Sequence, residues 1–381
     1  MRKIIIPIVV LCLVLSGCGA SDVRRISISR SAEDFILEPA NRSDGKPFHI
    51  AVMDLAPPIE SSYLWLKGLA QELQEIGYID EAVDLAAAPE DYEGYYQYLL
   101  KQDIGDHIVF DRECYYVGEG RDADVAAKLK SEVEAGRLDL IAATGTAPGL
   151  FLKELDLGIP FLVSMATDPV ASGIIDSPED TGNENIWALV EPDPCSRKFE
   201  AYHSMLGFHR LGLVEIEEYD VIGGNGQYRS KAKELGVDLK EIVFTEEEAS
   251  GEDYGKLLMD RIKSEDLSEL EGILFAYGSI HEEESSEIAD YLTRQGIPLL
   301  VGDGDVIVKN GGLIYLSFFD YEGYGRYAAK VMSNIFHGQK AGDQPCIFTS
   351  TSSIVLNLTT ADKIGFDTNM ALLRSTNRIY R

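Results

Sequence analysis

The chain has 381 residues, of which 45% are hydrophobic, and its formal net charge is −30. A body this acidic repels nucleic acid and anionic lipid headgroups, which excludes both as partners. The length suits two domains, because single hydrophobic cores stop growing at about 250–300 residues. Acidic runs such as 246–248 and 282–284 are typical of solvated helix faces, with calcium binding as the alternative.

The N-terminus has the pattern of a bacterial lipoprotein signal. Arg2 and Lys3 precede an apolar run at 4–15 that is too short to span a bilayer. Leu-Ser-Gly-Cys at 15–18 resembles the lipobox, in which small residues admit the signal peptidase and the cysteine is acylated, for example with palmitate. We therefore expect a signal peptide at 1–17, a lipidated Cys18, a flexible tether at 18–46, and a location on the extracytoplasmic face of the cell membrane. An ordinary secretory signal or a buried helix is the alternative.

The cysteines indicate neither a disulfide framework nor a zinc site. Apart from the lipidated Cys18, the cleaved chain keeps only Cys114, Cys195 and Cys346, an odd number without a C-x-x-C pair or suitably spaced histidines. One bridge with one free thiol, and three buried reduced cysteines, both suit an exported protein.

Strands alternate with helices along most of the chain. A buried-type strand at 48–53 precedes a helix at 63–76 that has one apolar face and ends at Gly77. This alternation predicts parallel, doubly wound sheets, and its two series predict two Rossmann-like α/β lobes. The further expected helices are 124–135, 148–155, 197–206, 228–235, 253–264 and 283–295, and the strands are 138–143, 160–165, 210–216, 239–244, 272–276 and 298–301.

The segment 78–117 is too long for a simple connection. Its central part predicts a helix whose aromatic face docks on a lobe, and 106–116 is expected to supply the second strand of the sheet. Extra packing is the interpretation we favour, and a ligand-gating lid is the alternative. The tyrosines of the expected aromatic face are Tyr92, Tyr95, Tyr96 and Tyr98.

Four stretches together resemble one family. They are 140–148, 159–173 with Thr-Asp-Pro-Val at 167–170, 309–340 with His-Gly-Gln-Lys at its end, and 354–365. Their order and spacing resemble the substrate-binding lipoproteins of ABC transporters with the type I periplasmic-binding-protein fold, a family that includes tryptophan- and tyrosine-binding members. The resemblance covers about 47–367, with departures at 78–117 and 186–190.

The resemblance implies two lobes joined by a hinge of three crossovers. The N-lobe would comprise 47–187 and 319–345, and the C-lobe 188–318 and 346–381. The crossovers would lie near Trp187, Ser317 and Pro345.

Ligands of open α/β sheets bind beyond the carboxyl ends of the strands. Thr144, Gly145 and Thr146 would stand at a helix N-terminus, whose free amides favour a carboxylate or a phosphate. Asp303, directly after a strand, would accept a hydrogen bond from a ligand ammonium. Capping by Asp54, Thr146 or Asp168, and a tight turn at 302–305, are the structural alternatives. The candidate ligand-binding residues are Asp54, Thr144, Gly145, Thr146, Thr167, Asp168, Tyr277, Gly278, Ser279, Asp303, its competitor Asp320, and Tyr321.

The sequence lacks the common motifs of enzymes. It contains no G-x-S-x-G elbow, no P-loop and no H-E-x-x-H pair. We therefore expect no enzyme activity, no cofactor and no metal, but capture of a small ligand between the lobes. The predicted donors suit an amino acid, aromatic or not, and a nucleobase or a small aromatic acid is the alternative. The resemblance implies an ABC permease and ATPase as partners. A ligand-sensing lipoprotein that feeds a signalling receptor is the first alternative, and a surface hydrolase is the second.

Overall fold

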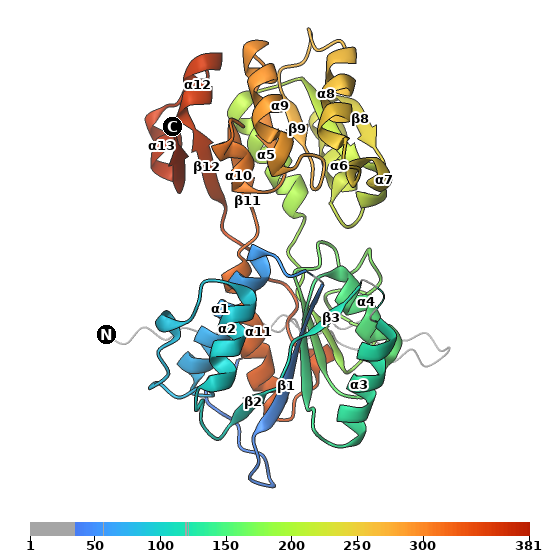
Figure 1. Ribbon diagram of the computed structural model, residues 1–381, viewed down its shortest axis with the longest axis vertical. Helices are drawn as coiled ribbons and strands as arrows, with labels where there is room; N and C mark the ends of the chain where they lie inside the picture. The colour runs from blue at the N-terminus through green and yellow to red at the C-terminus, as the bar shows by residue number, and fades with distance from the viewer. Residues whose placement is uncertain (1–34, 56, 119, 121) are drawn as a thin grey trace, which may run out of the picture.

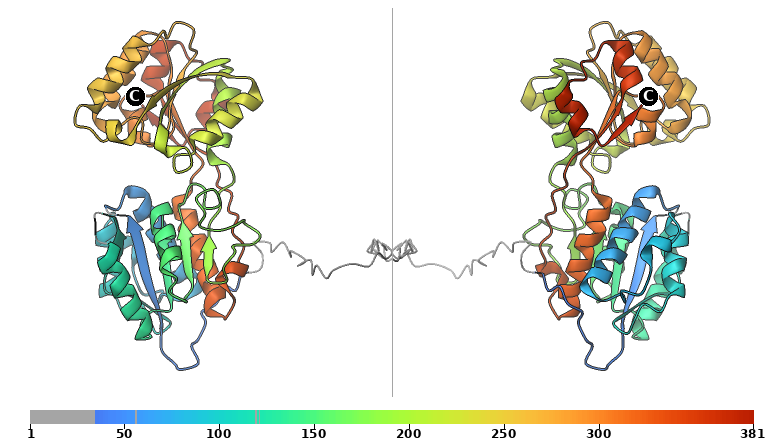
Figure 2. Two further views of the ribbon diagram at one scale, coloured as in Figure 1. Left: turned by 90° about the vertical axis from the view of Figure 1, so that its right-hand side faces the viewer. Right: turned by 90° about the vertical axis from the view of Figure 1, so that its left-hand side faces the viewer.

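The structure is a computed structural model that describes residues 35–55, 57–118, 120 and 122–381. The expected signal peptide and the lipidated Cys18 lie outside these residues. Two α/β lobes are stacked along the long axis of the molecule and joined by a narrow connection (Figures 1 and 2). None of the helices in the described part of the chain is long and apolar enough to cross a membrane.

The lower lobe in Figure 1, here called the N-lobe, is built on a six-stranded sheet of order β2-β1-β4-β5-β6, with β3 also paired to β1. All of its strand pairs are parallel. The central strands are buried on both faces, as expected for a parallel sheet covered by helices. The strands are β1 (Phe48–Leu55), β2 (Ile108–Phe110), β3 (Tyr115–Val117), β4 (Leu140–Thr144), β5 (Phe161–Ser164) and β6 (Ile186–Ala188).

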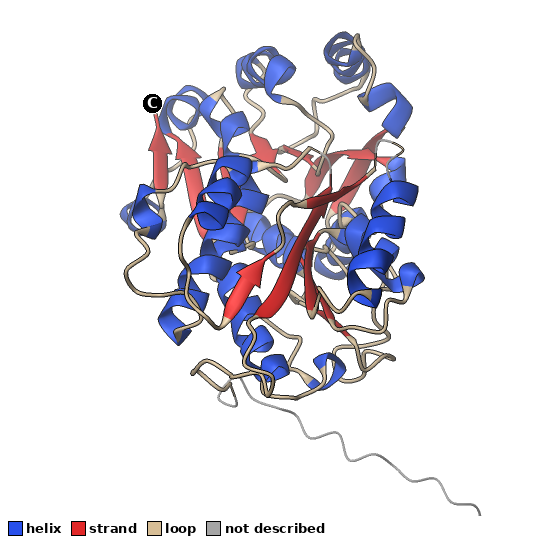
Figure 3. Cartoon of the chain, turned by 60° about the horizontal axis from the view of Figure 1, so that its bottom comes forward, coloured by secondary structure: helices blue, strands red, loops and turns tan. Residues whose placement is uncertain are grey.

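Helices cover both faces of this sheet (Figure 3). On one face α1 (Glu60–Ile76), α2 (Tyr92–Lys101) and α11 (Tyr321–Phe336) enclose a core that contains Trp65 and Trp187. On the other face lie α3 (Asp122–Glu134) and α4 (Thr146–Leu155). A short 3-10 turn, η1 (Leu85–Ala87), precedes α2, and η3 (Ala341–Asp343) follows α11.

The tyrosine-rich segment 78–117 is part of the N-lobe core. Tyr92, Tyr95 and Tyr96 of α2 are buried, whereas Tyr98 is partly exposed and donates a hydrogen bond to Asp84 O at 2.7 Å. The expected second strand is divided, since β2 pairs with the first part of β1 and β3 with its last part. These contacts are packing contacts of the kind we favoured for the segment.

The packed body begins before residue 47, inside the expected tether. Ile36 N donates to Asn334 Oδ1 at 2.9 Å, and Ser333 Oγ donates to Ile36 O at 2.6 Å. Ala40 is only 5% exposed, and its amide donates to Tyr78 OH at 3.0 Å. The prediction that 18–46 is a flexible tether is therefore wrong for its last residues, which are held by α11 and Tyr78.

The upper lobe, here called the C-lobe, contains a seven-stranded sheet of order β13-β12-β11-β10-β9-β7-β8. Its pairs are parallel except β11 with β12, which is antiparallel because the chain re-enters this lobe from the N-lobe. The strands are β7 (Arg210–Ile216), β8 (Asp238–Phe244), β9 (Ile273–Phe275), β10 (Leu299–Val301), β11 (Ile314–Ser317), β12 (Ser353–Asn357) and β13 (Arg378–Tyr380).

The C-lobe sheet is also covered on both faces, so the predicted two-lobed, doubly wound α/β fold is confirmed. One core involves α5, α6, α12 and α13, and the other involves α7, α8, α9 and α10. The helices are α5 (Pro194–Leu206), α6 (Asn225–Leu235), α7 (Glu246–Ala249), α8 (Tyr254–Ser264), α9 (Glu282–Arg294), α10 (Asp305–Lys309), α12 (Leu358–Ile364) and α13 (Met370–Ser375), with a 3-10 turn η2 (Glu217–Tyr219) after β7.

Three passages of the chain connect the lobes, at 189–193 after β6, at 318–320 after β11, and at 347–352 before β12. The second passage brings α11 back beside α1 of the N-lobe (Figure 1). The two helices approach so closely that a methyl group on Gly68 would lie 2.0 Å from Glu322 O, and one on Gly325 would lie 2.0 Å from Trp65 O. Glycine at both positions lets the backbones meet.

We expect Gly325→Ala to lower the unfolding free energy by about 1–3 kcal/mol, because the added methyl group forces α11 away from α1. Thermal unfolding followed by circular dichroism measures this loss. Gly226→Ala in α6 is the control, since its nearest non-local atom lies at 3.4 Å and no backbone must move. Equal stability of Gly325→Ala and the parent protein would show that the helices can separate at no cost.

Candidate functional site

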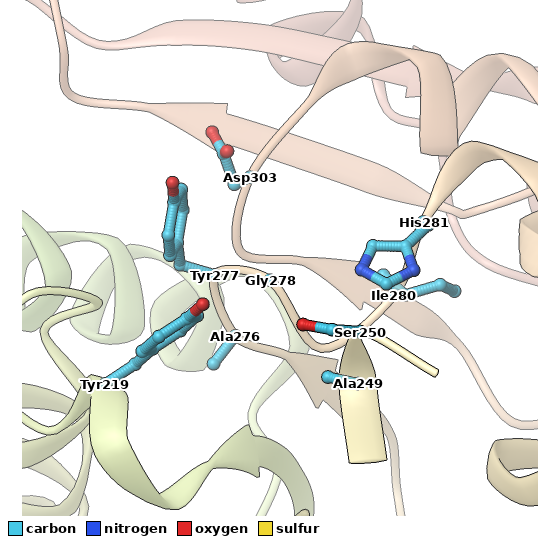
Figure 4. A pocket seen from close by; sticks show the side chains of 9 residues that line it. All are labelled: Tyr219, Ala249, Ser250, Ala276, Tyr277, Gly278, Ile280, His281 and Asp303. Carbon is cyan, nitrogen blue, oxygen red and sulfur yellow. The ribbon is translucent and has the colours of Figure 1, made fainter. Parts of the chain in front are cut away.

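A pocket in the C-lobe lies at the carboxyl ends of β7, β9 and β10 (Figure 4). Because neighbouring parallel strands end at the same edge, the segments that follow them converge there. The pocket is lined by Tyr219, Ala249, Ser250, Ala276, Tyr277, Gly278, Ile280, His281 and Asp303. Three of these residues, Tyr277, Gly278 and Asp303, are candidates predicted from the sequence.

Asp303 contributes the carboxylate of the pocket. It follows Gly302, whose amide donates to Phe275 O at 2.7 Å, and a Cβ atom at Gly302 would lie 2.4 Å from that oxygen. Glycine is therefore required for the turn that presents Asp303. The Asp303 side chain is partly buried, and no described residue hydrogen-bonds to its carboxylate or forms an ion pair with it. The carboxylate is free to accept hydrogen bonds from a ligand.

Two tyrosine rings form the wall beside Asp303. Tyr277 is 42% exposed, and its ring centroid lies 5.7 Å from that of Tyr219. Gly278, at φ +72°, packs against Tyr219, and a Cβ atom there would lie 2.8 Å from the ring. Burial, and then the charge of Asp303, raise the pKa of Tyr277, so its hydroxyl remains a hydrogen-bond donor at neutral pH. Figure 4 shows Tyr277 and Asp303 projecting to the same side.

Three other C-lobe and hinge candidates do not line this pocket. Ser279 is fully buried, and its hydroxyl donates to Ala276 O at 2.9 Å. Asp320 caps α11 by accepting a hydrogen bond from Gly323 N at 2.8 Å. Tyr321 stacks on Phe319, with centroids 5.8 Å apart and an interplanar angle of 6°. The carboxylate of Asp320 therefore has a structural partner that the carboxylate of Asp303 lacks.

In the N-lobe, β4 leads directly into α4. Thr144 is 1% exposed, and its hydroxyl donates to Met53 O at 3.4 Å. The cap of α4 is Gly145, at φ +93°, and no side chain caps the helix. Thr146 is the first helical residue, so the interpretation of Thr146 as the cap is wrong. The first amides of α4, which have no acceptor within the helix, lie at the carboxyl end of the N-lobe sheet.

The turn after β5 faces the C-lobe. A methyl group on Gly224, at the start of α6, would lie 3.7 Å from Thr167 Cγ2, so these residues lie close across the two lobes. Asp168 accepts hydrogen bonds from Val170 N at 3.1 Å and Ala171 N at 2.8 Å. Asp168 is therefore a turn cap, and Thr167 is the more available of the two side chains.

Asp54 ends β1 and is 5% exposed. One carboxylate oxygen accepts a hydrogen bond from Leu55 N at 2.7 Å, and the other has no partner. It does not cap α1, whose cap position is Ile59. Burial raises the pKa of Asp54 from its ordinary value of 3.8, against the lowering influence of Ser62 and Thr144. A buried charge therefore develops here as the pH rises.

This shift gives a pH-dependent contribution to stability. The folded state holds the Asp54 proton more tightly than the unfolded chain does. The resulting contribution to folding stability is fully present below pH 3.8 and is lost as the pH rises through the pKa that Asp54 has in the folded state. We expect Asp54→Asn, which carries no charge, to be more stable than the parent protein at pH 7 by about 1–3 kcal/mol. Urea unfolding at pH 7 and near pH 4 measures the difference, which should shrink at the lower pH. A difference that does not change with pH would contradict this explanation.

The three passages between the lobes meet at the carboxylate of Glu191, which is 5% exposed. Glu191 accepts hydrogen bonds from Ser350 N at 2.9 Å, Ser350 Oγ at 2.6 Å and Tyr324 OH at 3.1 Å, and it pairs with Arg197. Arg197 also donates to Ser350 O at 2.8 Å, and Asp320 N donates to Ser350 Oγ at 3.1 Å. One residue from each passage is therefore joined in this network, which we call the hinge node.

We expect Glu191→Ala to lower the unfolding free energy by about 1.5–3 kcal/mol, because buried donors lose a charged acceptor. The lobes should also sample more orientations, which small-angle X-ray scattering detects as a broader distribution of interatomic distances. Glu154→Ala, at an exposed position on α4, is the control. Unchanged scattering and stability in Glu191→Ala would show that the hinge does not depend on this carboxylate.

The three cysteines of the described chain are free, and Cys195 and Cys346 are buried. Burial raises the pKa of Cys114 and of Cys346 to about 12, so both thiols are protonated at neutral pH. The structure therefore has three reduced cysteines, of which Cys114 is only partly buried, in contrast to the expected three buried thiols. In residues 35–381, apart from 56, 119 and 121, no group of three or more His, Cys, Asp or Glu side chains could hold a metal ion.

The sequence does not predict Tyr219, Ser250 and His281 as pocket residues, nor Glu191 and Ser350 as members of the hinge node. The pocket residues lie on segments that are adjacent only in the folded sheet. The one available signal was position, because Tyr219 and His281, like Tyr277 and Asp303, follow strands within a few residues.

No family model matches the chain, and no curated protein matches it by sequence. Solved structures do match. The first is an ABC domain from Streptococcus pneumonia in complex with L-Trp, at 16% identity over 87% of this chain and 99% of that chain, with a TM-score of 0.59. The second is the ligand-free, open form of a substrate binding protein with adhesive properties from Clostridium difficile, at 16% identity, 87% and 99% coverage and a TM-score of 0.63.

A third is a leucine binding protein from Thermotoga maritima, at 13% identity over 76% of this chain and 83% of that chain, with a TM-score of 0.51. At these identities the likeness concerns the fold. The second and third of these structures are described as binding proteins, one of a substrate and one of leucine. The chain thus has the type I periplasmic-binding-protein fold, in which two doubly wound lobes are joined by three passages of the chain.

Proposed function

We propose that this protein is the solute-binding lipoprotein of an ABC importer and that it captures a small ligand between its two lobes. The observation that carries the proposal is the free carboxylate of Asp303 beside the exposed ring of Tyr277, at the carboxyl edge of one lobe of this fold. Solved proteins with the same fold include one in complex with L-Trp.

The polar groups at the two sheet edges suit an amino acid. Asp303 would accept hydrogen bonds from the ligand ammonium, and the first amides of α4 at Thr146 and Ala147 would receive its carboxylate. Tyr277 and Tyr219 would contact its side chain, and an aromatic side chain would add ring contacts. Thr167 lies where the lobes approach and would contact the ligand on closure.

Binding and closure are the proposed mechanism. A ligand that contacts both lobes favours the closed form by the difference between its affinities for the closed and open forms. The hinge node keeps the three passages together while the lobes move. The chain's own residues perform no chemical step, and ATP hydrolysis takes place in the partner subunits. An acylated Cys18 would hold the protein near the permease on the extracytoplasmic face of the membrane.

A thermal-shift screen of the twenty amino acids, with sugars and nucleosides as further ligand classes, tests this proposal. A ligand at one hundred times its dissociation constant adds about 2.7 kcal/mol to the stability of the folded state. We expect at least one amino acid to raise the melting temperature and Asp303→Ala to abolish that shift. Asp362→Ala, at an exposed position on α12, is the matched control and should retain it.

A melting temperature that no amino acid changes would contradict an amino-acid ligand. A shift that persists in Asp303→Ala would show that the ammonium lies elsewhere. Conversion of the ligand by the pure protein, detected by mass spectrometry, would contradict the binding-only mechanism and favour a hydrolase.

A further inference from the structure

A lysine buried in the C-lobe lies directly beneath the turn that presents Asp303. Lys198, on α5, is 1% exposed, and its Nζ donates a hydrogen bond to Gly302 O. None of the described carboxylates lies within ion-pairing distance of its ammonium group. Burying a lysine without an ion-pair partner costs free energy. The contacts of Lys198 must therefore explain why it lies in this position.

Two aromatic rings take the place of a carboxylate partner. Lys198 Nζ lies 5.2 Å from the ring centroid of Tyr315 and 5.7 Å from that of Phe319. Such cation–π contacts stabilise an ammonium that has lost its water. Tyr315 belongs to β11, whereas Phe319 lies in the passage at 318–320 that leads into α11. Lys198 therefore touches the ligand-facing turn with one contact and the hinge with another.

The Phe319 contact continues into the N-lobe. Phe319 stacks on Tyr321, the first residue of α11, and Phe319 N donates to Ser317 Oγ at 3.2 Å. The neighbouring Arg197 lies 4.6 Å from the ring of Phe318 and belongs to the hinge node. Consecutive cations of α5 thus hold consecutive rings of one passage between the lobes.

We propose that Lys198 is a positioning residue that ties the ligand-facing turn at 302–303 to the hinge passage at Phe319. Gly302 is held from one side by Phe275 O and from the other by Lys198, so the direction in which Asp303 projects is fixed by both. The importance of this direction for ligand capture rests on the proposed function, whereas the mechanical link between the two segments does not. Burial lowers the pKa of Lys198, and the negative charge of Asp303 acts in the opposite direction.

Hydrogen exchange of the full-length protein without ligand tests the mechanical link. In Lys198→Met we expect two separate amides to exchange faster, Gly302 N in the turn and Phe319 N in the passage. Each rate should rise by about tenfold, which corresponds to the loss of one hydrogen bond from a charged donor. Amides of β7 and β8 should keep their rates, which separates loosening of this link from general destabilisation of the C-lobe. Lys198→Arg, which keeps a cationic donor, should restore slow exchange.

Lys233→Met is the matched control, because Lys233 is exposed on α6. If Lys198→Met does not fold, Lys198→Gln, which is uncharged and shorter, carries the same expectation. Faster exchange in only one of the two segments, or equal effects of Lys198→Met and Lys233→Met, would overturn the proposal.

A second measurement uses any amino acid that shifts the melting temperature of the parent protein. If Lys198 acts through Asp303, the effects of Lys198→Met and Asp303→Asn on its dissociation constant will not add. Additive effects would overturn the link to Asp303. Absence of any ligand response would count against the proposed function, while the exchange experiment would still decide the link between turn and hinge.

Discussion

The three passages between the lobes meet at one buried carboxylate, that of Glu191. Its oxygens receive hydrogen bonds from Ser350 in the third passage and from Tyr324 on α11, and Ser350 Oγ also accepts a hydrogen bond from Asp320 in the second. A rearrangement that removes one of these hydrogen bonds leaves a buried donor, or part of the buried negative charge, without a partner. The network therefore has few alternative arrangements. The hinge node therefore fixes where the lobes join, and with it which sheet edges face each other.

The two facing edges differ in chemistry. The C-lobe edge presents a free carboxylate at Asp303 and an exposed ring at Tyr277, whereas the N-lobe edge presents the start of α4 and the buried Asp54. Because the strands of each sheet are parallel, both sets of groups follow strand ends. A ligand bound between the lobes, as proposed above, would contact both sets.

Two cationic side chains of the C-lobe stabilise the backbone next to the pocket and do not line it. Arg197 and Lys198 are adjacent in α5, yet Arg197 joins the hinge node and Lys198 holds the backbone of Gly302. Neither lines the pocket beside Asp303. The pocket therefore keeps the negative charge of Asp303, while Arg197 and Lys198 hold the backbone around it. A pocket with this charge suits a ligand that carries an ammonium group.

The sequence by itself determined the alternation of strands and helices, the two lobes and the residues that follow strand ends, because apolar periodicity and glycine positions are local properties. It predicted 210–216 within the bounds of β7, but it did not predict that the second strand of the first sheet is divided into β2 and β3. Only the tertiary structure decided that Asp320 and Asp168 are caps while Asp303 is free, and that Glu191 joins three passages. Hydrogen-bond partners so distant along the chain, such as Glu191 and Ser350, leave no periodic pattern in the sequence, since it is the packing of the lobes that brings them together.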